Sequence, residues 1–369
     1  MNDSTGDHRI DTLRRRLACG AAAALATVPL GAPCASLPVA GSTPRPATAA
    51  PGAVLDDLRA IDAGELRIHY ADAGPSDGTP VVLLHGWPYD IQTYADAATL
   101  LAGRGYRVVV PYLRGFGPTR FLSRRTPRNG QQAVLARDVL ALLDALRIER
   151  AVIGGCDWGA RTADIVAALR PDRCAGLVSV SGYLIGSQSA GQAPLLPKAE
   201  LSWWYQFYFA TERGRAGYDR HRRAFARLIW ELASPRWRFD EATFERSAAS
   251  LDNPDHVDVV IHNYRWRLGL ARGSRRLDGV EARLARKPAI GVPTITLEGD
   301  ANGAPHPPSD AYASLFTGAY EHRRVAGGIG HNLPQEAPVA FAAAVHDVAR
   351  GAIGGAAAQR ARRDVEAGG

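Results

Sequence analysis

The sequence places a carboxylate where a strand turns sharply into a helix. Residues 151–155 are small and apolar and predict a strand, and a helical pattern begins at Trp158. Between them lies Asp157. In a strand–turn–helix elbow, glycines two residues on either side of the nucleophile let the strand and the helix pack closely. Gly155 and Gly159 hold these places, so Asp157 is the candidate nucleophile.

The same spacing argues against the neighbouring thiol as the nucleophile. With Cys156 at the centre, the flanking residues would be Gly154 and Trp158, and an indole has no room at that position. We expect Cys156 to pack beside the elbow. Cys174 is the only other cysteine after residue 49, and a bridge between the two stays open for an oxidising compartment. No metal-ligand cluster is present in the sequence, so neither a metal nor a cofactor is expected.

A carboxylate nucleophile restricts the chemistry. A serine that attacks a saturated carbon forms an ether, which water cleaves with difficulty. A carboxylate forms an ester, which water can hydrolyse at its carbonyl carbon. Asp157 therefore suits epoxides or alkyl halides as substrates, and it does not suit ordinary ester or peptide hydrolysis.

The other members of a triad follow in the expected chain order of nucleophile, acid and base. His331 ends a Gly-x-Gly-His loop after the last predicted strand, and it is the candidate general base. Asp300 closely follows the strand predicted at residues 294–297, and it is the candidate acid that would hold the imidazole. Glu298 lies nearer the strand and ranks below Asp300.

Backbone N–H groups are expected to stabilise the oxyanion during ester hydrolysis. The strand at residues 81–84 ends in His85, and Trp87 follows two residues later. The backbone N–H groups of Trp87 and Trp158 would face the ester carbonyl oxygen. We interpret His85 as a structural residue of the turn.

These residues require a sheet whose strands end at one edge. Apolar runs alternate with helical patterns, which indicates an α/β fold with a mostly parallel sheet covered by helices. The runs that predict strands are residues 66–71, 81–84, 107–112, 151–155, 176–181, 294–297 and 320–325. The helical patterns cover residues 94–101, 131–146, 158–169 and 338–350.

One segment interrupts this alternation. Residues 183–291 predict several helices, no clear strand and many large aromatic side chains, so we interpret them as a helical cap inserted over the sheet. The core would then comprise residues 50–182 and 292–350. Residues 351–369 are rich in Ala, Gly and Arg and predict a disordered tail.

The motifs resemble those of the α/β-hydrolase-fold epoxide hydrolases and their relatives, the haloalkane dehalogenases, over roughly residues 55–350. Residues 85–88 resemble the H-G-x-P motif, and residues 157–159 resemble the shared D-W-G motif. The resemblance implies an eight-stranded sheet and two cap tyrosines that donate hydrogen bonds to the epoxide oxygen. Tyr205, before Gln206, and Tyr264, before Arg265, match their settings.

The resemblance also leaves alternatives open. Dehalogenases bind halide with two N–H donors; Trp158 matches one, while Trp87 stands where the other is often Asn. Fluoroacetate dehalogenases carry D-R-x-x-R, of which only Arg161 matches the second arginine, so a carboxylate substrate is not expected. Many relatives carry the acid three residues after the glycine, where this chain has Asn302. Some members of the fold bind ligands without turnover.

The charge distribution bears on the partners. The chain has 44 Lys and Arg against 37 Asp and Glu, a net charge of +7, and these residues are spread along the sequence. A nucleic-acid surface would require clustered basic and stacking residues. We therefore expect a small-molecule substrate, an epoxide or an alkyl halide, and no nucleic-acid partner.

The first 49 residues have the layout of an export signal. Residues 14–16 are arginines, an Ala-, Gly- and Leu-rich run covers residues 17–30, and small residues and prolines follow. The paired arginines favour the twin-arginine route to the periplasm or the exterior. Cleavage after Ala40 or Ala49 would fit. The apolar run is too short and too glycine-rich for a transmembrane helix, so no stable membrane insertion is expected.

Overall fold

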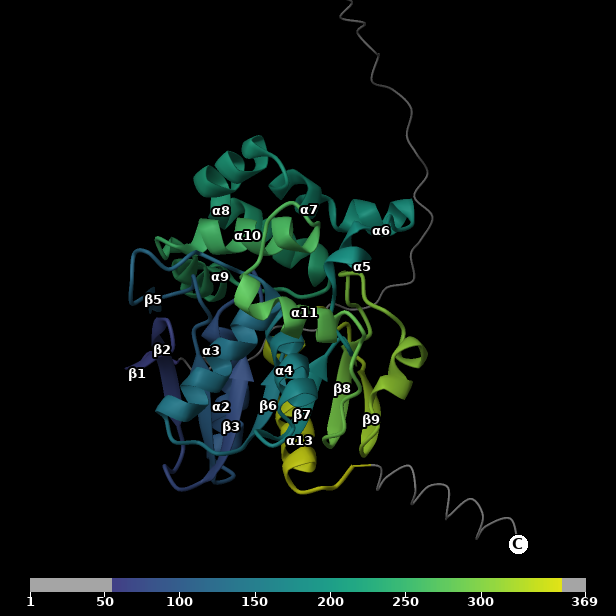
Figure 1. Cartoon of the computed structure of the whole chain (residues 1–369). Helices are drawn as coiled ribbons and strands as arrows, with labels where there is room; N and C mark the ends of the chain where they lie inside the picture. The colour runs from purple at the N-terminus through teal and green to yellow at the C-terminus, as the bar shows by residue number, and fades with distance from the viewer. Residues whose placement is uncertain (1–54, 354–369) are drawn as a thin grey trace, which may run out of the picture. The chain divides into compact units, whose positions relative to one another are not determined.

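A twisted sheet forms the centre of the computed structural model, which describes residues 55–353. The strand order is β1-β2-β4-β3-β6-β7-β8-β9, and the two-residue β5 pairs with β2 (Figure 1). The strands are β1 (Leu58–Ala63), β2 (Leu66–Ala73), β3 (Thr79–Leu84), β4 (Tyr106–Pro111), β5 (Arg120–Phe121), β6 (Ala151–Gly155), β7 (Cys174–Val180), β8 (Thr294–Gly299) and β9 (Tyr320–Val325). The predicted export segment and most of the predicted tail lie outside the described residues.

Strands β3, β4 and β6 to β9 pair in parallel, whereas β2 pairs antiparallel with β1, β4 and β5. The prediction of a mostly parallel sheet with eight principal strands is confirmed. The sequence pattern did not single out β1. Most of its residues are not buried and it carries Arg59 and Asp62, because it is an edge strand that pairs only with β2.

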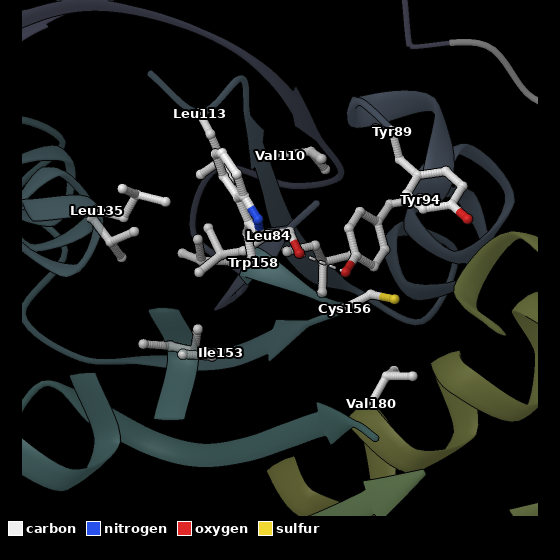
Figure 2. Close-up of a cluster of buried hydrophobic side chains, with 14 of the residues drawn as sticks. Leu84, Tyr89, Tyr94, Val110, Leu113, Leu135, Ile153, Cys156, Trp158 and Val180 are labelled. Carbon is white, nitrogen blue, oxygen red and sulfur yellow. Dashed lines mark hydrogen bonds between the residues drawn. The ribbon is translucent and has the colours of Figure 1, made fainter. Parts of the chain in front are cut away.

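Helices cover both faces of the sheet. All residues from Val81 to Leu84 in β3 are fully buried, and a strand is buried on successive residues only when both of its faces are covered. Helices α2 (Ala95–Ala102) and α13 (Pro338–Ala349) pack together, as do α3 (Gln132–Ala145) and α4 (Trp158–Leu169). Figure 2 shows part of this core, where the Tyr94 hydroxyl donates to the carbonyl of Leu84 at 2.7 Å.

Every named element between β7 and β8 is helical, as predicted for the inserted segment. Helices α7, α8 and α10 lie beyond one end of the strands (Figure 1). The helices of this cap are α5 (Gln188–Gln192), α6 (Pro197–Ser202), α7 (Trp204–Phe209), α8 (Glu212–Ala233), α9 (Glu241–Ala248), α10 (His256–Arg267) and α11 (Asp278–Leu284). The domain boundaries given above remain a prediction. Among residues 55–353, no helix combines the length and apolarity needed to cross a bilayer.

Both cysteines of the described chain are free and buried. Cys156 donates from its thiol to the carbonyl of His331 at 3.3 Å, and Cys174 donates to the carbonyl of Gly176 at 3.3 Å. The bridge that the sequence left open is therefore not formed in this structure. Cys156 packs beside the elbow, as expected.

Candidate active site

Asp157 occupies a sharp turn between β6 and α4. Its backbone has φ 55° and ψ −116°, a conformation that costs a non-glycine residue about 1–3 kcal/mol. The turn brings α4 against β3: a Cβ atom on Gly159 would lie 1.8 Å from the carbonyl oxygen of Leu84. Glycine is therefore required at this position. The elbow predicted from the glycine spacing is present, and it carries Asp157 beyond the carboxyl end of β6.

The carboxylate of Asp157 is held by one oxygen and free at the other. The backbone N–H of Trp87 donates to Oδ1 at 2.8 Å, and Nε2 of His331 lies 3.8 Å from Oδ2. Burial alone would raise the pKa of Asp157, but His331, Arg161 and the Trp87 amide together outweigh burial and hold that pKa below its ordinary value. Asp157 is therefore ionised at neutral pH, with one oxygen available to react.

The loop after β3 supplies the observed amide donor. Gly86 passes so close to the elbow that a Cβ atom there would lie 2.4 Å from the Cβ of Asp157. This close approach lets the Trp87 amide reach the carboxylate. Trp158 begins α4, but its N–H forms no recorded bond to the carboxylate among the described contacts; it remains a candidate second donor. The Trp158 side chain packs in the core with Leu84 and Leu113 (Figure 2).

The indole of Trp87 joins the core to the cap through a buried chain of hydrogen bonds. Its Nε1 donates to the Tyr218 hydroxyl at 2.8 Å, and that hydroxyl bonds Nε2 of His256 at 2.8 Å. His256 Nδ1 bonds the carbonyl oxygen of Gly115 at 2.9 Å. A carbonyl only accepts, so Nδ1 carries the proton and Nε2 accepts from Tyr218. Tyr218 and His256 were not predicted from the sequence, because no local pattern marks partners so distant along the chain.

His85 has the structural role expected for it. Its ring is fully buried, its Nε2 accepts from the Leu113 amide at 3.1 Å, and its Nδ1 therefore donates to the Gly86 carbonyl at 3.0 Å. Burial lowers the pKa of His85 to about 4. A neutral imidazole thus ties the loop after β3 to the loop after β4.

His331 is placed by contacts to its backbone. Its N–H donates to the hydroxyl of Ser234 at 2.9 Å. The carboxylate of Glu336 accepts from that hydroxyl and from the N–H of Gly330, both at 2.6 Å. Ser234 and Glu336 thus fix the loop that carries the base. Neither residue was predicted from the sequence, because a Ser after a cap helix and a Glu in a short helix, α12 (Leu333–Glu336), form no distinctive pattern.

The expected hydrogen bond between Asp300 and His331 is not formed. The carboxylate of Asp300 instead accepts from three backbone amides, those of Gly327, Gly328 and Ile329, at 2.8–3.1 Å. Nδ1 of His331 is buried and has no hydrogen-bond partner. In this structure Asp300 therefore does not orient the base, and its assignment as the acid of the triad stays a prediction. Its carboxylate instead holds the loop that leads to His331, because it accepts from three amides of that loop.

The two other candidates for the acid also have partners elsewhere. Glu298 bonds Nε2 of His306 at 2.8 Å. Asn302 donates to the Ser181 hydroxyl at 3.2 Å, and its Oδ1 accepts from the Ala304 amide at 3.0 Å. Among the described residues, none of these side chains reaches Nδ1 of His331. The site therefore has a nucleophile and a base in contact range, without a bonded acid.

The cap places both predicted tyrosines near the nucleophile. Tyr205 on α7 and Tyr264 on α10 meet edge to face, with ring centroids 5.4 Å apart, and each ring lies 5.2 Å from that of Trp87. Burial, with the charge of Asp157 adding to it, raises the pKa of Tyr205 to about 12, so the hydroxyl keeps its proton. Tyr205 lines the same cavity as Asp157, whereas Tyr264 is buried against Tyr205 and is not among the lining residues.

A cavity of about 440 Å³ lies between the sheet and the cap. This volume falls within the range of small-molecule sites, and the lining is mostly apolar. The polar and aromatic groups that converge on it include Trp87, Asp157, Arg161, Tyr205, Arg267 and His331. Within residues 55–353, no group of three or more His, Cys, Asp or Glu side chains could hold a metal ion.

Comparisons with known proteins agree with this architecture. Residues 79–219 match the model of the alpha/beta hydrolase fold family. A crystal structure of a candidate epoxide hydrolase from Klebsiella pneumoniae is 61% identical, covers 80% of this chain and 98% of its own, and superimposes with a TM-score of 0.80. The chain belongs to the α/β-hydrolase family.

Curated relatives of this α/β hydrolase carry both of the names that the motifs suggest. Epoxide hydrolase B from Mycobacterium tuberculosis is 38% identical over 42% of this chain and 47% of the relative. A haloalkane dehalogenase from Mycobacterium marinum is 35% identical over 44% of this chain and 58% of the relative. The chain spans about half the length of the curated relatives it matches.

Proposed function

We propose that this α/β hydrolase converts epoxides to vicinal diols through a covalent ester on Asp157. The observation that carries the proposal is the ionised Asp157 carboxylate, whose Oδ1 accepts from the Trp87 amide and which lines a cavity that Tyr205 also lines. A carboxylate on one side and a phenolic donor on the other suit the opening of a three-membered ring.

In the first half-reaction, Oδ2 of Asp157 attacks a ring carbon, and the bond from that carbon to the epoxide oxygen breaks. The oxygen takes a proton from Tyr205, supported by Tyr264 behind it. The product is an ester between Asp157 and the hydroxyalkyl chain. Because the leaving oxygen stays on the carbon chain, the adduct contains every atom of the substrate.

In the second half-reaction, His331 removes a proton from water, and the resulting hydroxide attacks the ester carbonyl carbon. Oδ1 of Asp157 is then the carbonyl oxygen, and it already accepts from the Trp87 amide. Charge that develops on this oxygen is stabilised by that amide and by the N-terminus of α4. Collapse of the intermediate breaks the bond between the carbonyl carbon and the alkyl oxygen. That oxygen takes the proton left on the Asp157 carboxyl group, which releases the diol and restores the carboxylate, and the proton held by His331 returns to Tyr205.

The two indoles next to the nucleophile favour an epoxide over an alkyl halide. Halide release would require N–H donors that face the cavity. The Trp87 indole already donates to Tyr218. The Trp158 side chain is buried, its Nε1 has no hydrogen-bond partner, and it is not among the residues that line the cavity. A phenol, by contrast, can both donate to an epoxide oxygen and recover its proton.

Trapping the ester tests the proposal. A His331→Gln variant should form the ester and fail to release it, so intact-protein mass should rise by the full mass of the epoxide. An alkyl halide would add the substrate mass minus hydrogen halide. Peptide mapping should place the adduct on the peptide that contains Asp157, and a matched Asp157→Asn variant should gain no mass.

Each alternative to the proposed function predicts a different outcome of the trapping experiment. An adduct on Cys156 would overturn the elbow assignment. An adduct formed only with alkyl halides would replace epoxide hydrolysis by dehalogenation. Tight ligand binding by the folded His331→Gln variant, with no adduct from any epoxide or halide, would instead identify a non-catalytic binding protein.

A further inference from the structure

Two arginines line the cavity of Asp157, and neither has a carboxylate within ion-pair distance among the described residues. Arg161 lies on α4, one turn after the nucleophile, and Arg267 ends α10. The Nε of Arg161 donates to the Leu184 carbonyl at 3.0 Å, and the Arg267 guanidinium lies 5.8 Å from the ring centroid of Tyr264. Within residues 55–353, neither guanidinium forms an ion pair with a carboxylate.

The charges in this cavity do not balance. Asp157 is the only acidic residue among those that line it, against two guanidinium groups. Burial lowers the pKa of Arg161 to about 10, and the charge of Arg267 acts in the same direction. Once Asp157 becomes a neutral ester, both positive charges would be left without any counter-charge. Both arginines are only partly exposed, and two partly desolvated positive charges without a counter-charge favour the binding of an anion in this cavity.

The adjoining cavity does not supply the missing charge. A second cavity, of about 590 Å³, shares Arg161 and Arg267 with the first, so the two side chains lie where the cavities meet. Its one acidic residue is Glu200, whose carboxylate accepts from the Leu195 amide at 2.7 Å. No ion pair links Glu200 to either arginine among the described contacts.

We propose that the epoxide substrate carries a carboxylate, which Arg161 and Arg267 bind while the ring lies against Asp157. The inference rests on the proposed epoxide chemistry. Guanidinium groups match the two oxygens of a carboxylate and form charge-assisted hydrogen bonds. From the sequence a carboxylate substrate was not expected, because Trp158 stands in place of one of the two elbow arginines. The fold supplies a second arginine from α10, at the far end of the cap segment.

A matched pair of substrates tests this inference. One is a terminal epoxide with a carboxylate at the end of a short alkyl chain, and the other is the corresponding primary amide, which has the same shape and no charge. Diol formation gives kcat/KM for each. The wild-type protein should prefer the carboxylate by about tenfold to a hundredfold, the range expected for hydrogen bonds to a charged group.

Variants of Arg267 should remove this preference. We vary Arg267 because Arg161 also stabilises the Asp157 carboxylate. An Arg267→Gln variant should bring the ratio of the two kcat/KM values close to one, and Arg267→Lys should restore part of it. Arg276→Gln is the matched control: it removes one positive charge from an exposed site on the cap and should keep the wild-type ratio.

A binding measurement distinguishes the proposed anion site from the proposed epoxide reaction. Calorimetric titration with the saturated carboxylic acid, which lacks the epoxide, should show binding to the wild type and its loss in Arg267→Gln. Turnover of the amide epoxide without any preference for the acid, and no binding of the saturated acid, would overturn the anion site and leave epoxide hydrolysis intact. Binding of the acid without turnover of either epoxide would support the anion site and contradict the proposed reaction. A loss of preference in Arg276→Gln equal to that in Arg267→Gln would also overturn the site, because a bulk charge effect would then explain it.

Discussion

At the scale of single residues, the contacts of Asp157 give its two carboxylate oxygens different roles. Oδ1 is fixed by the Trp87 amide, so it stays in place as the carbonyl oxygen of the ester. Oδ2 lies 3.8 Å from Nε2 of His331, so the base lies beside the oxygen that would form the ester. The Asp157 side chain can thus act as the nucleophile and then as the ester that water attacks, without a change of rotamer.

The tyrosines should act in the first half-reaction. A Tyr205→Phe variant should slow ester formation with an epoxide by about 10²–10⁴-fold, because the leaving oxygen loses its proton donor. Tyr264→Phe should cost less, since Tyr264 is buried behind Tyr205, and the double variant should nearly abolish the step. Single-turnover mass spectrometry measures the rate. Tyr208→Phe, on the same helix but outside the cavity lining, serves as the control. Wild-type rates in the double variant would assign both tyrosines to packing.

Asp300 should matter less for ester hydrolysis than a triad acid does. Replacing the acid of a Ser-His-Asp triad by Asn costs about 10⁴-fold. Asp300 bonds the amides of the loop before His331 and not the imidazole, so Asp300→Asn should slow release of the ester by less than about tenfold. The rate of ester hydrolysis after a single turnover, compared between Asp300→Asn and the wild type, measures this effect. A loss near 10⁴-fold, with the fold intact by circular dichroism, would show that Asp300 reaches His331 during the reaction.

At the scale of elements, the buried chain from Trp87 through Tyr218 to His256 connects the loop after β3 with α8 and α10. His256 is fully buried, and burial lowers its pKa to about 3. A protonated His256 would turn Nε2 into a donor facing the Tyr218 hydroxyl, which already receives the Trp87 indole proton. The link between core and cap therefore requires a neutral His256.

This link should make stability depend on pH. The pKa of His256 is lower in the folded than in the unfolded chain, so its contribution is full above about pH 6.5 and is lost as the pH falls towards about 3. Relative to a His256→Gln variant, the free energy of unfolding of the wild type should fall by up to about 1.4 kcal/mol for each pH unit below 6.5. Chemical denaturation at pH 7.5, 6 and 5 measures the difference. The variant keeps His85 and all other titrating groups, so their effects cancel; a difference that does not change with pH would contradict the assignment.

At the scale of the whole molecule, the first 49 residues should be removed during export. Residues 14–16 and the apolar run after them have the order of a twin-arginine signal. N-terminal sequencing of protein from periplasmic or extracellular fractions should find a start near residue 41 or 50. Replacing Arg14 and Arg15 by Lys should retain the precursor in the cytoplasm. An intact Met1 on active cytoplasmic protein would disprove the prediction.

Much of the fold follows from local rules that the sequence shows directly. The strands at β3, β4, β6 and β7 are continuous apolar runs, which only a sheet covered on both faces accommodates. The elbow was predictable because its geometry depends on neighbours within two residues. Gly159 leaves room for the carbonyl oxygen of Leu84, and a residue with a Cβ atom would not fit there. Strand β1 was not predicted, because an edge strand does not need a continuous apolar run.

The sequence by itself predicted the elbow at Asp157, the candidate base His331 and the alternation of strands and helices, because each depends on short-range spacing and on the order of elements along the chain. Only the tertiary structure decided the partners of those groups. Asp300 bonds a loop in preference to the base, Glu336 and Ser234 hold His331, and Arg267 joins Arg161 from the far end of the cap. A hydrogen bond or an ion pair requires atoms within a few tenths of an ångström of their ideal separation. Packing between segments that are distant along the chain sets that separation, and no local pattern records it.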